Sequence, residues 1–273
     1  MENWLKDKTI VITGASSGFG KLLTEKTITR YNCKVIGIGR NEEKLKGLKE
    51  RFGDKFLYFT FDVGNENNWR DFAQKIPIID LYPDILINNA GVLPSFARFE
   101  LTPDGEPERV FKTNFFASVY SVRHLLPIIK KHSKSPAVIN ISSSAILANV
   151  VGTSIYTSTK CALASFTKIL ALENKNLYVG LICPGFSGTG IFREQKHMDT
   201  NSSSIIGKNC SSPDKLTDYM LKKIIKKKKM IIPGTDAKAM HVFGNLFPNF
   251  TDKFICKVLK KSKLTVFEDV FCE

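Results

Sequence analysis

The feature that most constrains the fold is an apolar run that leads into a glycine-rich turn and then a helical pattern. Residues 8–13 (KTIVIT) are largely β-branched and apolar, which predicts a buried strand. The turn GASSGFG follows, and residues 21–31 then have helical spacing. Glycines let a backbone approach a pyrophosphate closely, and a helix N-terminus offers N–H groups and a positive dipole end. The order of strand, turn and helix therefore favours a dinucleotide site.

The same alternation of strand and helix continues along the chain. Further apolar strands are predicted at 33–39, 55–63, 84–91, 136–144, 177–185 and 230–233. Helical patterns lie between them, at 41–51, 65–76, 104–133, 156–174 and 222–229. This alternation predicts an α/β fold with a doubly wound parallel sheet. A length of 273 residues suits one such domain.

An arginine follows the second predicted strand at the position where the adenosine ribose of a dinucleotide would lie. NAD sites usually carry an acidic residue about 20 residues after the glycine turn, to hold the ribose 2′-hydroxyl. This chain has Gly39 and Arg40 there. An arginine can bind a 2′-phosphate through two hydrogen bonds, so the pair predicts NADP rather than NAD. The alternative is an ordinary arginine in a turn.

Amide side chains mark two other places. Residues 84–91 (DILINNAG) end in two asparagines and a glycine turn, at the sheet edge where open α/β sheets bind ligands. Asn114 stands among phenylalanines in the helical stretch 104–133. A buried asparagine in such surroundings must be hydrogen-bonded, for a structural or a catalytic reason.

The chemistry of the chain is concentrated between Ser143 and Lys160. Tyr156 and Lys160 are four residues apart, so in a helix they lie on the same face. A free phenol has a pKa near ~10, and an adjacent cation favours phenolate. Tyr156 is therefore a candidate general acid/base for a carbonyl/alcohol pair, with Ser143 bonding the same oxygen. The alternative is a surface helix in which the spacing has no function.

Together these motifs, in this order and at these intervals, resemble the short-chain dehydrogenase/reductase family over residues 6–190. TGASSGFG (13–20) matches the family's glycine motif, Asp62-Val63 its adenine-side motif, and NNAG (88–91) the motif after the fourth strand. The family's catalytic four correspond to Asn114, Ser143, Tyr156 and Lys160, and the segment that holds the nicotinamide amide corresponds to 184–189.

The resemblance implies a seven-stranded Rossmann sheet and assembly into dimers or tetramers. It implies that Tyr156 exchanges the proton, Lys160 lowers its pKa and binds the nicotinamide ribose, and Ser143 positions the carbonyl. Asn114 would hold a water of a proton relay. The cofactor-binding residues it implies are Gly14, Ser16, Ser17, Gly18, Phe19, Gly20, Arg40, Asp62, Val63, Asn89, Ala90, Gly91, Tyr156, Lys160, Pro184, Gly185 and Thr189; Ser143 and Tyr156 would contact substrate.

We expect residues 1–240 to form the catalytic domain, with a substrate lid at about 186–215, and residues 241–273 to form an amphipathic extension. In the extension Phe243, Phe247, Phe250 and Phe254 fall at helical intervals interrupted by Pro248, and Thr251 is a candidate helix cap. We expect this stripe to pack on the protein's own body or on a sister subunit. An interfacial membrane contact is the alternative, because lysines flank the stripe.

Charge and composition narrow the functions and locations that the sequence allows. Residues 208–263 hold 14 lysines against four aspartates and so carry most of the formal net charge of +14. A solvated surface is the expected reading, because this segment lacks the interleaved aromatics of a nucleic-acid site. No signal peptide or transmembrane run is recognisable, and the six cysteines show no metal-ligand spacing. We expect a cytoplasmic protein with reduced thiols and no metal site, peripheral to a membrane if the stripe contacts lipid.

The sequence thus predicts an NADP(H)-dependent oxidoreductase that interconverts a ketone and a secondary alcohol. A loose similarity of the C-terminal segment to relatives that reduce lipid-like or steroid-like ketones favours a hydrophobic substrate. The alternative is a non-catalytic NADP sensor of the same fold. Retention of all four catalytic residues together favours the enzyme.

Overall fold

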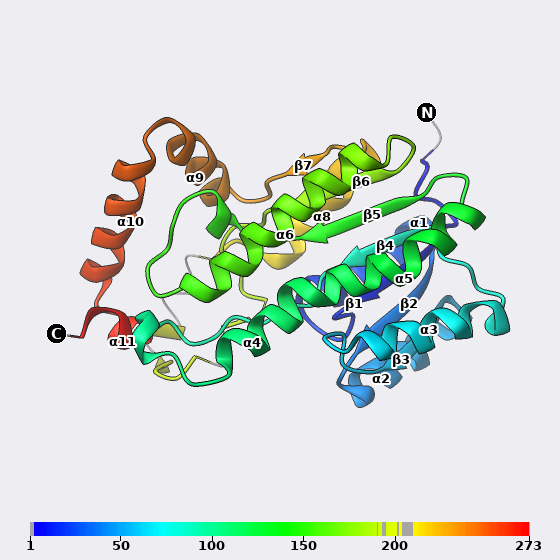
Figure 1. Ribbon diagram of the computed structural model, residues 1–273, viewed down its shortest axis with the longest axis horizontal. Coiled ribbons are helices and arrows are strands. Elements are labelled where there is room, and N and C mark those ends of the chain that lie inside the picture. The colour runs from blue at the N-terminus through cyan, green and yellow to red at the C-terminus, as the bar shows by residue number, and fades with distance from the viewer. Residues whose placement is uncertain (1–2, 190, 193–194, 201, 204–209, 273) are drawn as a thin grey trace.

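A parallel sheet of seven strands forms the centre of the computed structural model, which describes residues 3–189, 191–192, 195–200, 202–203 and 210–272 (Figure 1). The strand order is β3-β2-β1-β4-β5-β6-β7. The strands are β1 (Thr9–Thr13), β2 (Lys34–Gly39), β3 (Phe56–Thr60), β4 (Ile85–Asn88), β5 (Ala137–Ile141), β6 (Tyr178–Ile182) and β7 (Met230–Ile231). The order reverses between β1 and β4, which is where ligands bind in open α/β sheets. The predicted doubly wound Rossmann-type sheet is confirmed.

Helices cover both faces of this sheet. Successive side chains of a strand point to opposite faces, so Ile10 and Ile12 belong to one core and Val11 to the other. The first face is covered by α1 (Gly18–Tyr31), α2 (Glu42–Phe52) and α8 (Pro213–Ile225). The second is covered by α3 (Glu66–Ile79), α5 (Ala117–His132) and α6 (Ser154–Glu173) (Figure 1). Both cores are made largely of branched aliphatic side chains, as a parallel sheet with two covered faces requires.

Two buried asparagines cross-link the centre of the sheet. Asn88 of β4 lies opposite Asn140 of β5 and donates to its amide oxygen at 2.9 Å. Ser121 of α5 donates to Asn88, and Asn140 donates to Thr167 of α6. Each amide therefore has partners, which removes the penalty for burying it. The first asparagine of the NNAG motif thus lies in a structural network.

The predicted single helix over 104–133 is divided by a wider turn. Its segments are α4 (Glu106–Phe111), a π-helical turn η3 (Lys112–Phe116) and α5. Elsewhere in the described residues, short 3₁₀ turns occur at η1 (Gly53–Lys55), η2 (Phe99–Leu101), η4 (Ser144–Ile146) and η5 (Thr265–Phe267). The π turn carries Asn114, and single π turns inside helices occur frequently at functional sites.

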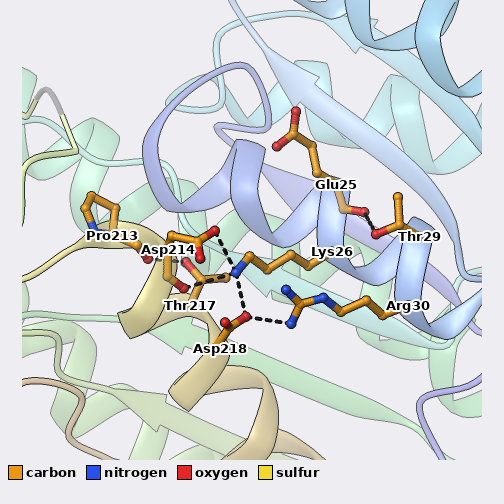
Figure 2. A network of polar contacts seen from close by, with 8 residues as sticks. All are labelled: Glu25, Lys26, Thr29, Arg30, Pro213, Asp214, Thr217 and Asp218. Carbon is orange, nitrogen blue, oxygen red and sulfur yellow. Dashed lines mark hydrogen bonds and ion pairs between the residues drawn. The ribbon is translucent and has the colours of Figure 1, made fainter.

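An ionic network joins α1 to α8 (Figure 2). The Lys26 ammonium, on a side chain only 7% exposed, lies 2.7 Å from an Asp214 carboxylate oxygen and 2.5 Å from one of Asp218. It also donates to the Asp214 carbonyl, while Arg30 contacts Asp218. The network holds α1, which begins at the glycine turn, against α8.

The C-terminal segment folds into α9 (Thr235–Leu246), α10 (Pro248–Ser262) and α11 (Glu268–Phe271). The expected boundary at 240 falls inside α9. The helical run is interrupted at Pro248 as expected, because α9 ends at Leu246 and Pro248 begins α10, where the first turn needs no proline N–H. Thr251 is not a cap, because it lies in the first turn and donates its hydroxyl to the Phe247 carbonyl.

The phenylalanine stripe of this segment does not pack on the body of the protein. Phe243, Phe247, Phe250 and Phe254 each expose 52–68% of their surface, so of the two expected packing partners the protein's own body does not cover the stripe, and packing on a sister subunit stays a prediction. The inner side of α10 makes the contacts with the body instead, through partly buried residues such as Leu259. Helices long and apolar enough to cross a bilayer do not occur within the described parts of the chain.

Candidate active site

A cavity of about 300 Å³ opens at the carboxyl edge of the sheet. It brings together most of the residues that the sequence predicts: Gly14, Ser17, Gly18, Phe19, Arg40, Asn89, Ala90, Gly91, Ser143, Tyr156, Lys160, Pro184, Gly185 and Thr189. Ser16, Gly20, Asp62, Val63 and Asn114 lie outside its lining, and their positions are described below.

The glycine turn is built for a close approach of backbone to backbone. Gly14 and Gly18 have φ of 67° and 50°, which side-chain-bearing residues rarely adopt. A Cβ on Gly20 would collide with the Gly14 carbonyl. Gly20 therefore lets helix α1 pack closely against the turn, although it does not line the cavity itself. The Asn89 amide donates to the Thr13 carbonyl at 2.9 Å, and this contact ties the turn to the end of β4.

The N-terminus of α1 is prepared for an anion. Ser17 is its N-cap in an extended conformation and makes no side-chain cap hydrogen bond. The first turn has no acidic side chain, and its residues Gly18 and Phe19 line the cavity. The free N–H groups and the positive dipole end of the helix are therefore available to a ligand there. These features fit the pyrophosphate of a dinucleotide.

The ribose-side residues lie at the end of β2. Arg40 is exposed, lines the cavity and has no ion-pair partner among the residues that the structure describes. A Cβ at Gly39 would lie 3.3 Å from Ser16 Oγ, so Ser16 lies beside this strand end behind the cavity. An exposed guanidinium that forms no ion pair with the described residues fits a phosphate better than a bare ribose.

Asp62 and Val63 form a turn outside the cavity lining. The Asp62 carboxylate accepts a hydrogen bond from Gly64 N at 2.9 Å, and the Val63 carbonyl accepts one from the Trp69 indole at 2.8 Å. Val63 is buried. In this structure the pair shapes the turn after β3.

Ser143 and Tyr156 meet at the other side of the cavity. Ser143 follows β5 and begins η4, where its Oγ accepts a hydrogen bond from Ala145 N at 3.1 Å. The Ser143 side chain lies close enough to the Tyr156 hydroxyl to lower its pKa, and both residues line the cavity. Two hydroxyls that converge at a cavity wall can bind one substrate oxygen together, as the sequence predicts.

The pKa of Tyr156 shifts in the direction opposite to the sequence-based expectation. Burial raises the pKa of Tyr156, and the hydrogen bond from Ser143 only partly opposes this. Burial also lowers the pKa of Lys160 to about 8, and its Nζ lies 5.7 Å from the centre of the Tyr156 ring. The expected phenolate is therefore not favoured, because a low-dielectric site disfavours both charged forms.

Lys160 lines the cavity beside Gly91, and Asn114 lies behind this part of the lining. Lys160 Nζ donates to the Ile141 carbonyl at 3.1 Å. The Asn114 side chain is fully buried; it accepts from Val92 N at 2.8 Å and donates to the Val92 carbonyl at 2.9 Å. A Cβ at Gly91 would lie 3.3 Å from both Asn114 Oδ1 and Lys160 Nζ. Asn114 thus fixes the loop after β4 beside the lysine.

The loop after β6 closes the nicotinamide side of the predicted site. The Pro184 carbonyl accepts from Ser144 N at 2.9 Å, which ties this loop to Ser143. A Cβ on Gly185 would collide with the carboxylate of Asp236, and that carboxylate accepts from Phe186 N at 2.7 Å. Only glycine allows this contact, so Asp236 holds the loop against the start of α9.

The sequence-based predictions missed an apolar wall of the cavity. Phe96, Phe186 and Phe192 line it, with ring centres 6.3 Å apart in the pairs Phe96–Phe192 and Phe186–Phe192. Behind them Phe267 of η5 lies 4.8 Å from Phe96. The available signal was the occurrence of phenylalanines in the loops that follow the ends of β4 and β6.

The expected lid at 186–215 is described only in part. Phe186, Ile191 and Phe192 line the cavity, and α8 already starts at Pro213, so the last residues of the expected lid are helical. Residues 190, 193–194, 201 and 204–209 of the lid lie outside the described residues. Across the described residues, no group of three or more His, Cys, Asp or Glu side chains is arranged to hold a metal ion.

Comparisons with known proteins agree with this geometry. A model of the short chain dehydrogenase family matches residues 8–200. Uncharacterized oxidoreductase YxnA of Bacillus subtilis is 30% identical over 267 residues, covering 95% of this chain and 74% of that protein. Fatty acyl-CoA reductase of Acinetobacter baylyi is 31% identical over 278 residues, covering 90% and 88%.

A solved structure supports the same assignment. The closed form of a serine dehydrogenase in complex with NADP⁺ superposes with a TM-score of 0.74 at 25% identity, covering 82% of this chain and 93% of that one. The matching family model, the fold and the arrangement at the carboxyl edge agree. The chain belongs to the short-chain dehydrogenase/reductase family of nicotinamide-dependent oxidoreductases.

Proposed function

We propose that the protein interconverts a ketone and a secondary alcohol, with NADP(H) as its cofactor. The observation that carries this proposal is the convergence of the Ser143 and Tyr156 hydroxyls on a cavity that also contains Arg40. Two strands, β1 and β4, lie between β2 and β5, so β2 and β5 are three inter-strand spacings apart, about 14 Å at the usual spacing. An extended dinucleotide can therefore reach from Arg40 to the two hydroxyls.

The bound nicotinamide would supply or accept a hydride. Ser143 Oγ would donate a hydrogen bond to the substrate oxygen, and the Tyr156 hydroxyl would exchange its proton with that oxygen. The raised pKa keeps Tyr156 protonated at neutral pH, which suits its role as the acid in carbonyl reduction. Lys160 would bind the cofactor ribose, and Asn114 would hold its neighbouring loop and a relay water.

We infer that the substrate is hydrophobic. The substrate end of the cavity is lined by Phe96, Phe186 and Phe192, and Leu93 and Val150 add aliphatic surface. Apolar walls with a few polar groups are typical of small-molecule sites in which the polar groups orient the ligand. Such a wall favours ketones with a large apolar body over small charged ones.

The test is NADPH oxidation across a panel of ketones that extends from small ketoesters to steroids and long-chain 3-ketoacyl compounds. Tyr156→Phe should keep cofactor binding and lose about 10²–10⁴-fold in turnover, because only the exchangeable proton is removed. Tyr120→Phe, a partly buried tyrosine on α5 outside the cavity lining, is the matched control. Wild-type turnover by Tyr156→Phe would refute the assigned role.

The alternative is an NADP sensor that binds the cofactor without turning over a substrate. It would bind NADPH in a titration and oxidise none of the panel. Turnover of any ketone that depends on Tyr156 would exclude it as the sole function.

A further inference from the structure

Helix α10 carries two apolar faces, and only one is used by the fold. Thr251, Ile255 and Leu259 form the inner face: Thr251 is buried, and Leu259 packs against the cluster around Val266 and Phe267. The outer face consists of Phe247, Phe250, Phe254 and Val258, which follow one another at intervals of three or four residues. A helix in a purely water-exposed position would show this second apolar face only at a cost.

Helix α9 extends the outer face. Gly244 brings the α9 backbone so close to the Leu147 carbonyl that a Cβ there would collide with it. This contact fixes the orientation of α9 and leaves Val242, Phe243 and Leu246 at least half exposed. We define the outer stripe as Val242, Phe243, Leu246, Phe247, Phe250, Phe254 and Val258.

Basic side chains run along one side of the outer stripe. Lys253, Lys257 and Lys260 follow at intervals of four and three residues, so they form a row on α10 next to the phenylalanines. Asp252 is the single acidic residue of α10, and its carboxylate accepts hydrogen bonds from Asn149 at 2.9 and 2.6 Å. The outer stripe thus has lysines beside it. The Asp252 carboxylate, in contrast, is bonded to Asn149 of the protein body.

We propose that the outer stripe docks on the surface of an anionic lipid bilayer, with α10 lying in the plane of the interface. The phenylalanines would enter the boundary between headgroups and acyl chains, and the lysine row would face the headgroups. A second copy of the chain fits less well. A symmetric interface on this stripe would bring the two lysine rows near one another, and like charges repel.

The position of α10 is consistent with such docking. It forms the left edge of the molecule in Figure 1, beyond the carboxyl edge of the sheet where the cavity opens. Asn149, to which Asp252 is bound, precedes Val150 of the cavity wall. A bilayer against α10 would therefore lie at the same end of the molecule as the site.

The experiment is sedimentation of the full chain with vesicles of phosphatidylcholine alone and of phosphatidylcholine mixed with phosphatidylserine, each at low and high salt. We expect binding to the phosphatidylserine vesicles at low salt, with weakening at high salt. Phe250→Ser combined with Phe254→Ser should lower the partition coefficient at least about tenfold, because two buried rings are lost. Ile78→Ser with Leu172→Ser, two exposed apolar residues near the ends of α3 and α6, should leave it unchanged.

The charge contribution has its own matched pair of variants. Lys253→Glu, Lys257→Glu and Lys260→Glu together should lower the partition coefficient by at least about fivefold for each lysine lost. The control converts Lys226, Lys228 and Lys229 to Glu; these residues precede β7 and so lie at the opposite, amino edge of the sheet. The control should bind vesicles like the wild type.

Three outcomes would overturn the proposal. One is no sedimentation of the wild type with phosphatidylserine vesicles at low salt. Another is equal loss of binding in the stripe variants and their controls. The third is a stripe variant that binds vesicles like the wild type but has a smaller mass by light scattering, which would make the stripe a contact between copies. None of these measurements uses catalytic activity, so they do not depend on the proposed reaction.

Discussion

Lys160 shows how one environment sets the properties of two catalytic candidates. Its side chain is 97% buried and it shares that environment with Tyr156, so burial acts against the ammonium and the phenolate together. The four-residue spacing placed the two groups on one helix face, but it carried no information on how much water they would keep. The structure therefore favours neutral tyrosine beside an easily deprotonated lysine.

A pH-dependent stability follows from Lys160. Its pKa in the folded protein is lowered from 10.5 to about 8, so between these values the unfolded chain binds more protons. Stability must then rise with pH in that window, by up to about 3 kcal/mol. Denaturant unfolding from pH 7 to 10.5 should show this rise in the wild type relative to Lys160→Met.

Lys168→Met, which replaces an exposed lysine of the same helix, should keep the wild-type profile. A Lys160→Met curve parallel to that of the wild type would contradict the lowered pKa.

Arg40 determines, in our interpretation, which dinucleotide is preferred. Arg40→Ala should weaken NADPH binding by about 1.5–3 kcal/mol, the value of a hydrogen bond to a charged group, and leave NADH binding nearly unchanged. Titration of both cofactors by fluorescence or calorimetry measures this. Arg51→Ala is the control, because the Arg51 guanidinium on α2 pairs with Glu25 on α1. Equal losses for NADPH and NADH would refute the preference.

At the scale of elements, the contact between α1 and α8 depends on one buried ammonium. The Lys26 stem lies within the protein, whereas Asp214 and Asp218 keep 60% and 42% of their side chains exposed. Burial raises the pKa of Asp218, but the hydrogen bonds from Lys26 and Arg30 outweigh it and the net pKa is lowered. The two aspartates can thus be hydrated by water if Lys26 is replaced, which limits the stability that the ion pairs contribute.

Lys26→Met keeps most of the stem and removes the charge. We expect it to lower the free energy of unfolding by about 1–2 kcal/mol, since the hydrogen bonds to charged partners are lost while their solvent access limits the penalty. Arg30→Met removes a half-exposed partner of the same Asp218 and should cost less than about 1 kcal/mol. Urea unfolding of both variants gives the comparison; a larger loss for Arg30→Met would reverse the assigned order.

At the scale of the whole molecule, the last residues of the chain return to the site. Val266, Phe267 and Val270 are buried in one cluster with Phe96 and Tyr156. Gly152 has a φ of 79°, and a Cβ there would lie 2.5 Å from Val270, so the loop before α6 is shaped to receive this segment. The end of the C-terminal segment therefore packs against the wall of the site.

Phe267→Ala should cost about 3–5 kcal/mol of stability, the usual range for removing a buried phenylalanine. It should also raise KM for bulky substrates more than for NADPH, because Phe267 supports Phe96 and not the glycine turn. Phe271→Ala, which lies partly buried in the same cluster, should have a smaller effect on both. Unfolding curves measure the loss of stability, and KM values determined separately for the ketone and for NADPH measure the effect on the site. An unchanged KM for every ketone would contradict the idea that Phe267 supports Phe96.

The sequence by itself determined the parts of this protein that depend on local pattern. Strands and helices alternate because apolar residues recur at their respective periods, and that alternation already implies the doubly wound sheet. The glycine turn and the spacing of Tyr156 and Lys160 are likewise local, because each involves residues within one or two turns of chain. The carboxyl edge then collects them, since all strands of the sheet are parallel.

Only the tertiary structure decided what depends on distant segments meeting. The hydrogen bonds of Asn114 to Val92 and Thr159, the aromatic wall from Phe96 to Phe192 and the return of Phe267 each join residues separated by long stretches of chain. Burial is also a property of the whole fold. It raised the pKa of Tyr156 where the sequence suggested a phenolate, and it left the outer stripe of α9 and α10 exposed where helical periodicity suggested packing. Periodicity identifies an apolar face, but only the packed molecule determines which apolar faces are covered.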